Sequence, residues 1–410
     1  MKNLFANRVL NNESSDLDDI FKNSANPANI SFAGGFPDAT LFPDNDLKQA
    51  YQTAIDTTGP AIFQYQSTQG LPALRQKLAQ RMASHASVMT TADNVMLTQG
   101  GQQAIDLVAK LLLNRGDSMV VEGPTYMGAL AAFDTYEPTY YEVPVDNHGM
   151  NIHQLRQTLQ AHPEIKLIYT VPDFHNPTGT TLSAKRRQAM VALANQYDVM
   201  ILEDSPYRDL RYSGKSVPAI KHYDTEGRVI FISSFSKILS PALRTGWIVA
   251  DDEVMHALIN LKSAIDVQSP NITLAAINAY LETHDIDDHI ATINQAYRIK
   301  RDAMLTALDR YMPTNVQYTR PAGGFFIWVT LPTDIDATQL LNDVVLPRAH
   351  VAYVPAACQF ASRQVKNAFR LNFTSLAPET ITTGIKRLGE LLQKSTAVVP
   401  VPSLIPANQF

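Results

Sequence analysis

Short apolar runs alternate with helical segments between about residue 95 and residue 250, and this alternation limits the possible folds more than any other feature of the chain. The runs are rich in β-branched and aromatic residues, which favours strands. Strands are predicted over 95–100, 118–124, 166–172, 198–204, 228–234 and 244–250, with a helix over 101–114. The last run follows its predecessor too closely for a parallel return, so we expect it to be antiparallel. The sequence therefore predicts an α/β domain whose mostly parallel sheet is flanked by helices.

The rest of the chain predicts a smaller α+β domain. After about residue 252 the sequence is helical up to the strand-like run 323–332, and mixed pieces then lead through 368–375 to a final helix near 379–394. We expect residues 1–44 to belong with the small domain, 45–289 to form the large domain and 290–394 to complete the small one. Residues 395–410 contain three prolines and are predicted to form an extended tail.

Composition excludes several classes of protein. The 410-residue chain has a net charge of −5, a pI near 6.1 and no dense Lys/Arg block, which argues against nucleic acid and anionic membranes as partners. The single cysteine, Cys358, permits no internal disulfide and no metal cluster, and it fits a reducing compartment. No secretory signal and no membrane-length apolar run are found, so we expect a cytoplasmic protein.

Polar residues with chemical potential stand where the predicted strands end. In open α/β sheets the ligand lies beyond the carboxyl ends of the strands. These ends present, strand by strand, Gly100, Gly101 and Gln102; Pro124, Thr125 and Tyr126; Asn176; Asp204 and Tyr207; and Ser234, Ser236 and Lys237. A semi-buried lysine loses its proton easily and can form a Schiff base with an aldehyde, and hydroxyls with a nearby Arg244 suit a phosphate. Together these groups indicate pyridoxal phosphate.

The other strand ends can meet the remaining needs of this cofactor. Asp204 can hold the pyridine nitrogen protonated, which makes the ring an electron sink. Tyr207 and Asn176 can each donate a hydrogen bond to the phenolic oxygen, and Tyr126 can stack on the ring. The helix that begins near Gly101 offers free backbone N–H groups to the phosphate.

Each of these residues also has a purely structural interpretation. An aspartate at a strand end is often a helix cap, an Asn-Pro pair often marks a turn, and a tyrosine often only packs. A lysine at a strand end is usually solvated. Five successive strand ends that supply five cofactor roles would require all of these structural interpretations to coincide, so we favour the cofactor site.

These motifs resemble the fold type I pyridoxal-phosphate enzymes, specifically the class I/II aminotransferases. The most similar pattern is that of the 2-aminoadipate, kynurenine and aromatic amino acid aminotransferase group, which also supplies the catalytic domain of MocR-type regulators. The matching stretches follow one another along nearly the whole chain: "ISFAGGFPDATLFP" (30–43), "QYQSTQGLPALR" (64–75), "LTQGGQQAIDL" (97–107), "EGPTY" (122–126), "NPTGTTL" (176–182), "LEDSPYRDLRYSG" (202–214), "SSFSKILSPALRTGW" (233–247) and "FRLNFT" (369–374).

The resemblance implies a role for each matching residue. Lys237 would be catalytic, forming the Schiff base with the cofactor and shuttling the substrate proton. Tyr65 would reach the phosphate of the partner subunit's cofactor, which makes a homodimer part of the active site. The phosphate would be held by Ser234, Ser236, Arg244 and the backbone at Gly101 and Gln102.

The resemblance also implies how the substrate is held. Arg370 would clamp the α-carboxylate bidentately, a role for which lysine is a poor substitute, and Gly35 and Asn176 would assist. The structural alternative for Arg370 is a surface arginine on an edge strand. Its apolar neighbours Phe369 and Leu371 argue against that alternative.

Three positions depart from the family pattern. Gly101 stands where a hydroxyl residue is usual, so the phosphate would depend more on backbone N–H groups. His175 replaces a common glutamine, with no consequence that follows from the sequence. Members that act on acidic side chains carry an arginine in the helix before the "AGG" segment, whereas here the corresponding stretch has Asp16, Asp18 and Asp19, which would repel a distal carboxylate.

The expected activity is transfer of an amino group from an aromatic or large apolar L-amino acid to a 2-oxo acid such as 2-oxoglutarate, in a ping-pong cycle. A pyridoxal-phosphate-dependent carbon–sulfur β-lyase and a 2-aminoadipate-type transaminase are alternatives with the same fold. A MocR-like effector-binding module is a non-enzyme alternative, opposed by the fewer than thirty residues before "ISFAGG", too few for a winged helix. A nicotinamide-binding Rossmann protein lacks support, because no GxGxxG opens the first strand-to-helix turn.

Overall fold

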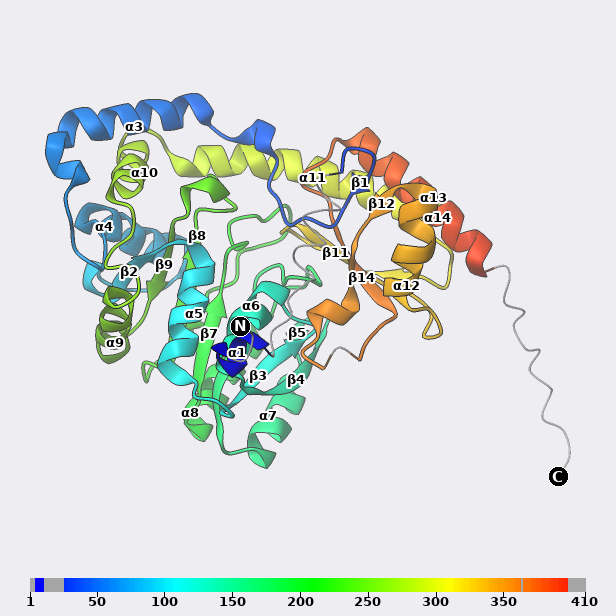
Figure 1. Ribbon diagram of the computed structural model, residues 1–410, viewed down its shortest axis with the longest axis horizontal. Coiled ribbons are helices and arrows are strands. Elements are labelled where there is room, and N and C mark those ends of the chain that lie inside the picture. Colours follow the sequence, from blue (N-terminus) through cyan, green and yellow to red (C-terminus); the bar gives the residue numbers. More distant parts are fainter. Residues whose placement is uncertain (1–3, 11–25, 363, 397–410) are drawn as a thin grey trace, which may run out of the picture.

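The computed structural model describes residues 4–10, 26–362 and 364–396 of the chain. A large body built on one sheet lies beside a smaller one, and the long helix α11 (Ile286–Tyr311) runs from the first to the second (Figure 1). Side chains near the start of α11, such as Ile290, belong to the core of the large body. Those near its end, such as Leu308, belong to the core of the small one. The expected domain boundary between 289 and 290 thus falls inside this shared helix.

The large body is built on an eight-stranded sheet in the order β2-β9-β8-β7-β6-β3-β4-β5. The strands are β2 (Val95–Thr98), β3 (Ser118–Gly123), β4 (Thr139–Asp146), β5 (Gly149–Met150), β6 (Ile165–Thr170), β7 (Met200–Asp204), β8 (Val229–Ser234) and β9 (Gly246–Val249). The ladders that join β4, β3, β6, β7 and β8 are parallel, and β9 is antiparallel to both neighbours. The mostly parallel sheet and the antiparallel β9 are confirmed.

The strands β4 and β5 are absent from the predicted set. β4 alternates between exposed and half-buried positions near one end of the sheet, so its sequence lacks the continuous apolar run that marks the central strands. β5 is only two residues long and pairs antiparallel with β4. Both lie far along the sheet from β8 and do not change the expected architecture.

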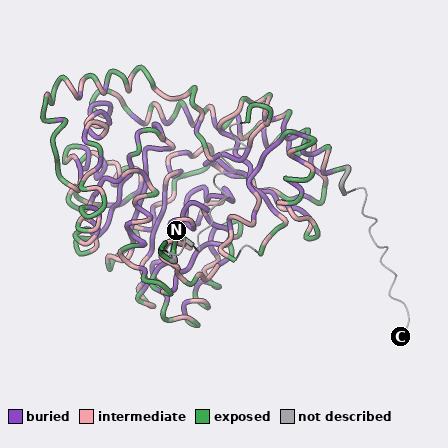
Figure 2. Tube along the Cα trace, in the orientation of Figure 1, coloured by how far each residue is buried: buried purple, intermediate pink, exposed green. Residues whose placement is uncertain are grey.

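Central strands bury both faces, which explains their near-continuous apolar sequences. Val121 and Leu167 belong to one core, whereas their chain neighbours Val120 and Ile168 belong to another. Buried residues accordingly follow the strands through the middle of the molecule (Figure 2). The flanking helices are α5 (Gly100–Leu112), α6 (Met127–Phe133), α7 (Ile152–Ala161), α8 (Ala184–Tyr197) and α9 (Asp252–Ser263). The helix α5 packs over β8 and β9, while α7 packs on β4 and α8 on β7.

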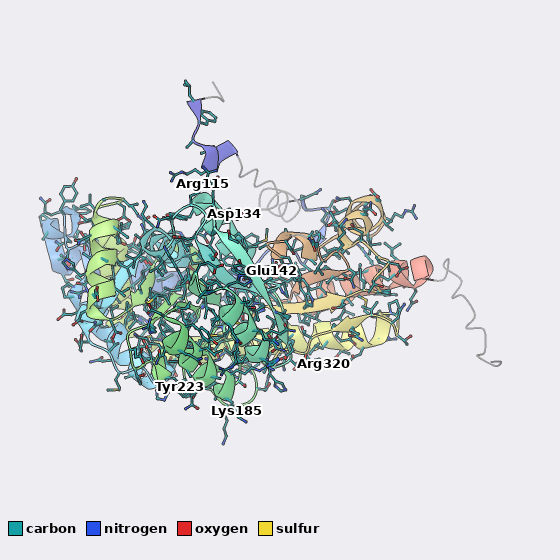
Figure 3. The ribbon with its side chains drawn as sticks, turned by 90° about the horizontal axis from the view of Figure 1, so that it is seen from below. Arg115, Asp134, Glu142, Lys185, Tyr223 and Arg320 are labelled. Carbon is teal, nitrogen blue, oxygen red and sulfur yellow. The ribbon has the colours of Figure 1, made fainter. Side chains whose placement is uncertain are left out.

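A further group of helices covers the β2 end of the sheet. These are α3 (Asp44–Thr58), α4 (Pro72–Arg81) and α10 (Asn271–Thr283), and α3 packs along α10 (Figure 1). The short α1 (Asn7–Leu10) contacts the turn after α6. Residues 4–10 stand out from the large body beyond Arg115 and Asp134 (Figure 3). Among the described residues, no helix combines the length and apolar character needed to cross a membrane.

The smaller body contains a four-stranded antiparallel sheet in the order β10-β11-β14-β13. Its elements are β10 (Gln317–Tyr318), β11 (Phe326–Thr330), α12 (Ala337–Leu340), α13 (Leu346–Ala349), β12 (Val351–Ala352), β13 (Val354–Pro355), β14 (Ala368–Asn372) and α14 (Pro378–Thr396). The N-terminal strand β1 (Ile30–Ser31) pairs parallel with β12. The helix α14 takes in the first two residues of the expected tail, and the remainder, 397–410, lies outside the described residues.

A buried ion cluster fixes two loops at the carboxyl edge of the large sheet. Asp173, just beyond β6, accepts hydrogen bonds from Arg187 Nη2 of α8 at 2.8 Å and from Arg208 Nη1, just beyond β7, at 2.9 Å. Burial raises the pKa of Asp173, but the charges of Arg187 and Arg208 outweigh burial and lower it below 3.8. The ionised carboxylate therefore stabilises the fold above that pH, and the contribution is lost as the pH falls.

We expect Asp173→Asn to lower the free energy of unfolding at pH 7 by about 3–5 kcal/mol, because it leaves two buried arginines without their anion. Asp198→Asn is the matched control, since Asp198 pairs with Arg228 on the surface, and its cost should stay below about 1 kcal/mol. Urea unfolding followed by circular dichroism measures both. The deficit of Asp173→Asn should shrink as the pH drops below 3.8, and equal costs for the two variants would contradict the prediction.

Candidate active site

A cavity of about 340 Å³ lies at the carboxyl edge of the large sheet, against the small body. Because β2, β3, β6, β7 and β8 run in the same direction, their carboxyl ends meet at this edge. The residues of the predicted site that line the cavity are Gly35, Gly101, Gln102, Tyr126, Asn176, Asp204, Tyr207, Ser234, Ser236, Lys237, Arg244 and Arg370. The structure thus brings together every predicted site residue except Tyr65.

Lys237 lies three residues beyond the end of β8 and lines the cavity. Its Nζ donates a hydrogen bond to the carbonyl of Gly35 at 2.9 Å and lies 5.6 Å from the ring centre of Phe325. Burial, together with the charges of Arg370 and Arg244, lowers the pKa of Lys237 to about 8. A much larger fraction of this amine than of an ordinary lysine is therefore neutral near pH 7 and available as a nucleophile or a base.

Asp204 ends β7 and is the cavity's acid. Its pKa is raised to about 7. Burial is the largest cause and the nearby Glu122 adds to it, while the hydrogen bond from Tyr169 and the charge of Lys237 oppose the rise. Tyr169 donates that bond from its hydroxyl to Asp204 Oδ2 at 2.9 Å. A positively charged ring nitrogen beside this carboxyl would favour its ionised form.

Sequence reasoning missed Tyr169. It lies inside β6, where its hydroxyl faces Asp204 on the adjacent parallel strand, and its ring packs edge-on against Phe133 at 5.3 Å. The available signal was that a tyrosine in a fully buried strand needs a hydrogen-bond partner. The sequence did not identify that partner, because the choice depends on the register between β6 and β7.

Asn176 and Tyr207 form one wall of the cavity. Asn176 Nδ2 donates to the hydroxyl of Tyr207 at 3.4 Å, and Asn176 Oδ1 accepts from Arg370 Nη1 at 2.9 Å. Tyr126, half-buried at the end of β3, also faces the cavity. These three side chains offer two hydrogen-bonding groups and an aromatic ring for a planar ligand, as the resemblance implies.

Another part of the cavity wall has the features of a phosphate site. The N-terminus of α5 faces it through Gly101 and Gln102, and Ser234, Ser236 and Arg244 complete the wall. Gly100 has φ +78°, and a Cβ there would lie 2.6 Å from Arg244 Nη2, so the arginine requires glycine at this position. A Cβ on Gly101 would instead meet no heavy atom within 4 Å, which leaves open space beside the free N–H groups. The donors and this space fit the phosphate of the expected cofactor.

Arg370 lies on β14, between β11 and β13, and is therefore not on an edge strand. It is 4% exposed, donates from Nη2 to the carbonyl of Ala33 at 2.7 Å and stacks over the ring of Phe326 at 4.2 Å. Its buried Nε has no hydrogen-bond partner, and no carboxylate of the described residues forms an ion pair with Arg370. A buried cation of this kind is suited to an anionic substrate group.

Two apolar residues of the cavity also escaped sequence reasoning. Phe326 supports Arg370 from β11 and packs edge-on against Tyr207 at 5.8 Å. Phe36 lines the cavity and is partly exposed. The apolar sequence around Phe326 indicated only a strand, because its facing partners come from other parts of the chain.

Tyr65 does not line this cavity, and 77% of its surface is exposed in the single chain. His175, the replacement for glutamine, is buried, with Nε2 3.1 Å from a Glu122 carboxylate oxygen and Nδ1 2.8 Å from the hydroxyl of Thr178. This pair lies behind the cavity wall and not in it. The aspartates 16, 18 and 19 lie outside the described residues.

We expect trinitrobenzenesulfonate to modify Lys237 of the cofactor-free protein with a rate that rises with pH and levels off above about 8, because only the neutral amine reacts. Asp204→Asn should move this midpoint down and Arg370→Leu should move it up, since the first removes a negative charge and the second a positive one. Peptide mass spectrometry gives the rate, with the exposed Lys185 as internal control (Figure 3). One common midpoint near 10.5, the ordinary lysine value, in all three proteins would contradict the prediction.

Comparison with known proteins places this geometry in a family. The model of the aminotransferase class I and II family matches residues 37–388. Aromatic-amino-acid aminotransferase 1 of Thermococcus litoralis is 40% identical over 394 residues, which are 95% of this chain and 94% of that protein. The 2-aminoadipate transaminase of Thermus thermophilus is 32% identical over 390 residues, 94% of this chain and 96% of that protein.

A solved structure agrees with the sequence relatives. The kynurenine aminotransferase of Pyrococcus horikoshii, in complex with PMP and with KYN as substrate and KYA as product, superposes with a TM-score of 0.92 at 37% identity. The match covers 96% of this chain and 98% of that one. The fold is therefore that of the fold type I enzymes, and the chain belongs to the class I and II aminotransferases.

Proposed function

We propose that this aminotransferase takes the amino group of an aromatic or large apolar L-amino acid and passes it to a 2-oxo acid such as 2-oxoglutarate. The observation that carries the proposal is the composition of the cavity wall. Its cations are Lys237, Arg244 and Arg370, and among the described residues no further cation lines it for a second carboxylate. Phe36, Ile105 and other apolar residues form much of the rest, which favours an apolar side chain.

The cofactor is pyridoxal 5′-phosphate, which supplies, when bound, an electron sink for the negative charge that develops at the substrate α-carbon. The donors at the start of α5 and the side chains of Ser234, Ser236 and Arg244 would hold its phosphate. The carboxylate of Asp204 would hold the ring nitrogen, and Asn176 and Tyr207 would donate hydrogen bonds to the ring oxygen. Tyr126 would pack against the face of the ring.

The remaining residues act on the substrate. Arg370 binds the α-carboxylate through two parallel N–H donors, and Asn176, already bonded to Arg370 Nη1 at 2.9 Å, keeps the guanidinium oriented. Gly35, in the N-terminal segment, assists Arg370 in holding the substrate. A Cβ at this position would lie 3.3 Å from the ring of Phe326. Lys237 takes the α-proton on Nζ and returns it, a task for which a pKa of about 8 is well matched.

The named relatives support this choice of donor and define its main competitor. One relative is named for aromatic amino acids and one solved neighbour for kynurenine. Another relative is named for 2-aminoadipate, an acidic amino acid. Acidic and aromatic donors therefore belong in the same experiment.

We expect phenylalanine, tyrosine and leucine to shift the visible absorbance of the bound cofactor faster than glutamate or 2-aminoadipate, without any 2-oxo acid present. The reason is the apolar wall, which offers a distal carboxylate no fixed cation. Stopped-flow absorbance gives the rates, and an excess of a 2-oxo acid added afterwards should restore the starting spectrum. Lys237→Ala is the control that loses the proton carrier. Faster reaction of the acidic donors would overturn the proposed donor class.

We further propose a homodimer with shared active sites. Tyr65 is highly exposed, and Phe63, Ile265 and Val267 are exposed apolar residues whose segments meet where the backbone N–H of Gln66 donates to the side chain of Gln268. Apolar surface of this kind is suited to burial against a second copy. In this dimer, Tyr65 of each subunit reaches the phosphate of the cofactor that the other subunit binds.

We expect Tyr65→Ala and Lys237→Ala proteins, each poorly active alone, to regain activity when unfolded and refolded together. A hybrid dimer then contains one site with an intact Lys237 and an intact Tyr65 of the partner subunit. The 2-oxo acid produced per dimer measures the recovery, and Lys237→Ala refolded with Asp204→Ala is the control that impairs both sites. If Tyr65 served its own subunit, the first mixture would recover nothing.

A further inference from the structure

The carboxylate of Asp266 lies where the end of α9 meets the start of α5, outside the cavity wall. Lys262 of α9 is wholly buried, and its Nζ is 2.6 Å from Asp266 Oδ1. Burial raises the pKa of Asp266, but hydrogen bonds from Lys262, Gln103 and Gln99 outweigh burial and lower it. The group is therefore an anion held by several donors and not a solvated surface charge.

The second oxygen of Asp266 holds the first turn of α5. Asp266 Oδ2 accepts from Gln103 Nε2 at 2.7 Å and from Gln99 Nε2 at 2.9 Å. Gln103 in turn accepts the backbone N–H of Gln99 on its Oε1 at 2.8 Å. One carboxylate thereby fixes two side chains and, through Gln103, the backbone at the entry to the helix.

That entry turn is the phosphate end of the cavity. The carbonyl of Gln99 accepts from Arg244 Nη2 at 3.0 Å, and the next residues are Gly100, Gly101 and Gln102. The side chain of Arg244 also passes so close to Gly100 that a Cβ there would collide with it. A shift of Gln99 would therefore displace both the free N–H groups of α5 and the guanidinium.

The loop that carries Asp266 holds a strained residue. Val267 has φ +62°, a conformation that a β-branched residue avoids. Such strain persists only where neighbours fix the chain on both sides. Here Asp266 is fixed by Lys262 and the two glutamines, and Gln268 accepts the backbone N–H of Gln66, the residue after Tyr65.

We propose that Asp266 is a positioning residue for the cofactor phosphate. It acts through Gln99 and Gln103 to hold the N-terminus of α5 and Arg244 in one arrangement, without touching the ligand. The proposal rests on the placement of the phosphate at Gly101, Gln102 and Arg244 that the proposed function includes. It adds that the ion pair between Lys262 and Asp266, which lies outside the cavity wall, sets the affinity of that site for the phosphate.

The test compares pyridoxal 5′-phosphate with pyridoxal, which lacks the phosphate, by absorbance titration of the cofactor-free protein. We expect Asp266→Asn to weaken binding of the phosphorylated compound about tenfold, equivalent to about 1.4 kcal/mol, and to leave the affinity for pyridoxal unchanged. The inhibition constant of inorganic phosphate, measured against the phosphorylated compound, should correspondingly rise. Gln103→Ala, which removes the hydrogen-bonding side chain on α5, should change the ratio of the two affinities in the same direction. This variant replaces Asp266→Asn if Asp266→Asn does not fold.

Asp117→Asn is the matched control. Asp117 pairs with Lys166 Nζ at 2.6 Å and accepts the backbone and side-chain N–H groups of Asn114, but it lies at the opposite end of β3. Its two affinities should equal those of the wild type. An unchanged ratio in Asp266→Asn and Gln103→Ala, or an equal loss of both ligands, overturns the positioning role. If Arg244→Ala also leaves the ratio unchanged, the proposed phosphate site itself is wrong.

Discussion

Arg370 joins the two bodies of the molecule at the cavity, and the site exists only where they meet. Its guanidinium extends from the four-stranded sheet of the small body and donates hydrogen bonds to Asn176 Oδ1 in the large body and to the carbonyl of Ala33 in the N-terminal segment. No described carboxylate neutralises it, so its charge remains available to an anion and acts on Lys237. A buried cation without a partner costs stability, which the surrounding hydrogen bonds and the ring of Phe326 reduce only in part.

The electrostatics of the cavity bring the pKa values of an amine and a carboxylic acid close to each other. Burial and two arginines lower the pKa of Lys237 to about 8, and burial raises that of Asp204 to about 7. Groups with such values exchange protons readily near neutrality. These pKa values suit proton transfer at an α-carbon. They arise because a few charged groups are buried together in a largely apolar wall, and no single contact accounts for them.

The two ends of the cavity are supported differently. The ring end depends on neighbours in the sheet, since Tyr169 reaches Asp204 from the adjacent strand. The phosphate end depends on a helix start, which lacks side-chain capping of its own at Gln99 and is held from outside by Asp266. The loop that carries Asp266 also contains Gln268, whose side chain accepts the backbone N–H of Gln66, the residue after Tyr65. The proposed phosphate site and the proposed homodimer contact therefore share one short segment.

The sequence by itself determined the mostly parallel sheet and the clustering of its site residues, because apolar runs define strand ends and parallel ends share one edge. It did not determine which buried groups pair across strands or between distant loops. Tyr169 with Asp204 and Asp266 with Gln103 depend on register and helix packing, which leave no local pattern. Tyr65 was placed by resemblance alone, and its exposure in one chain becomes meaningful only with a second copy. Tertiary structure decided these contacts, since each joins residues far apart in sequence.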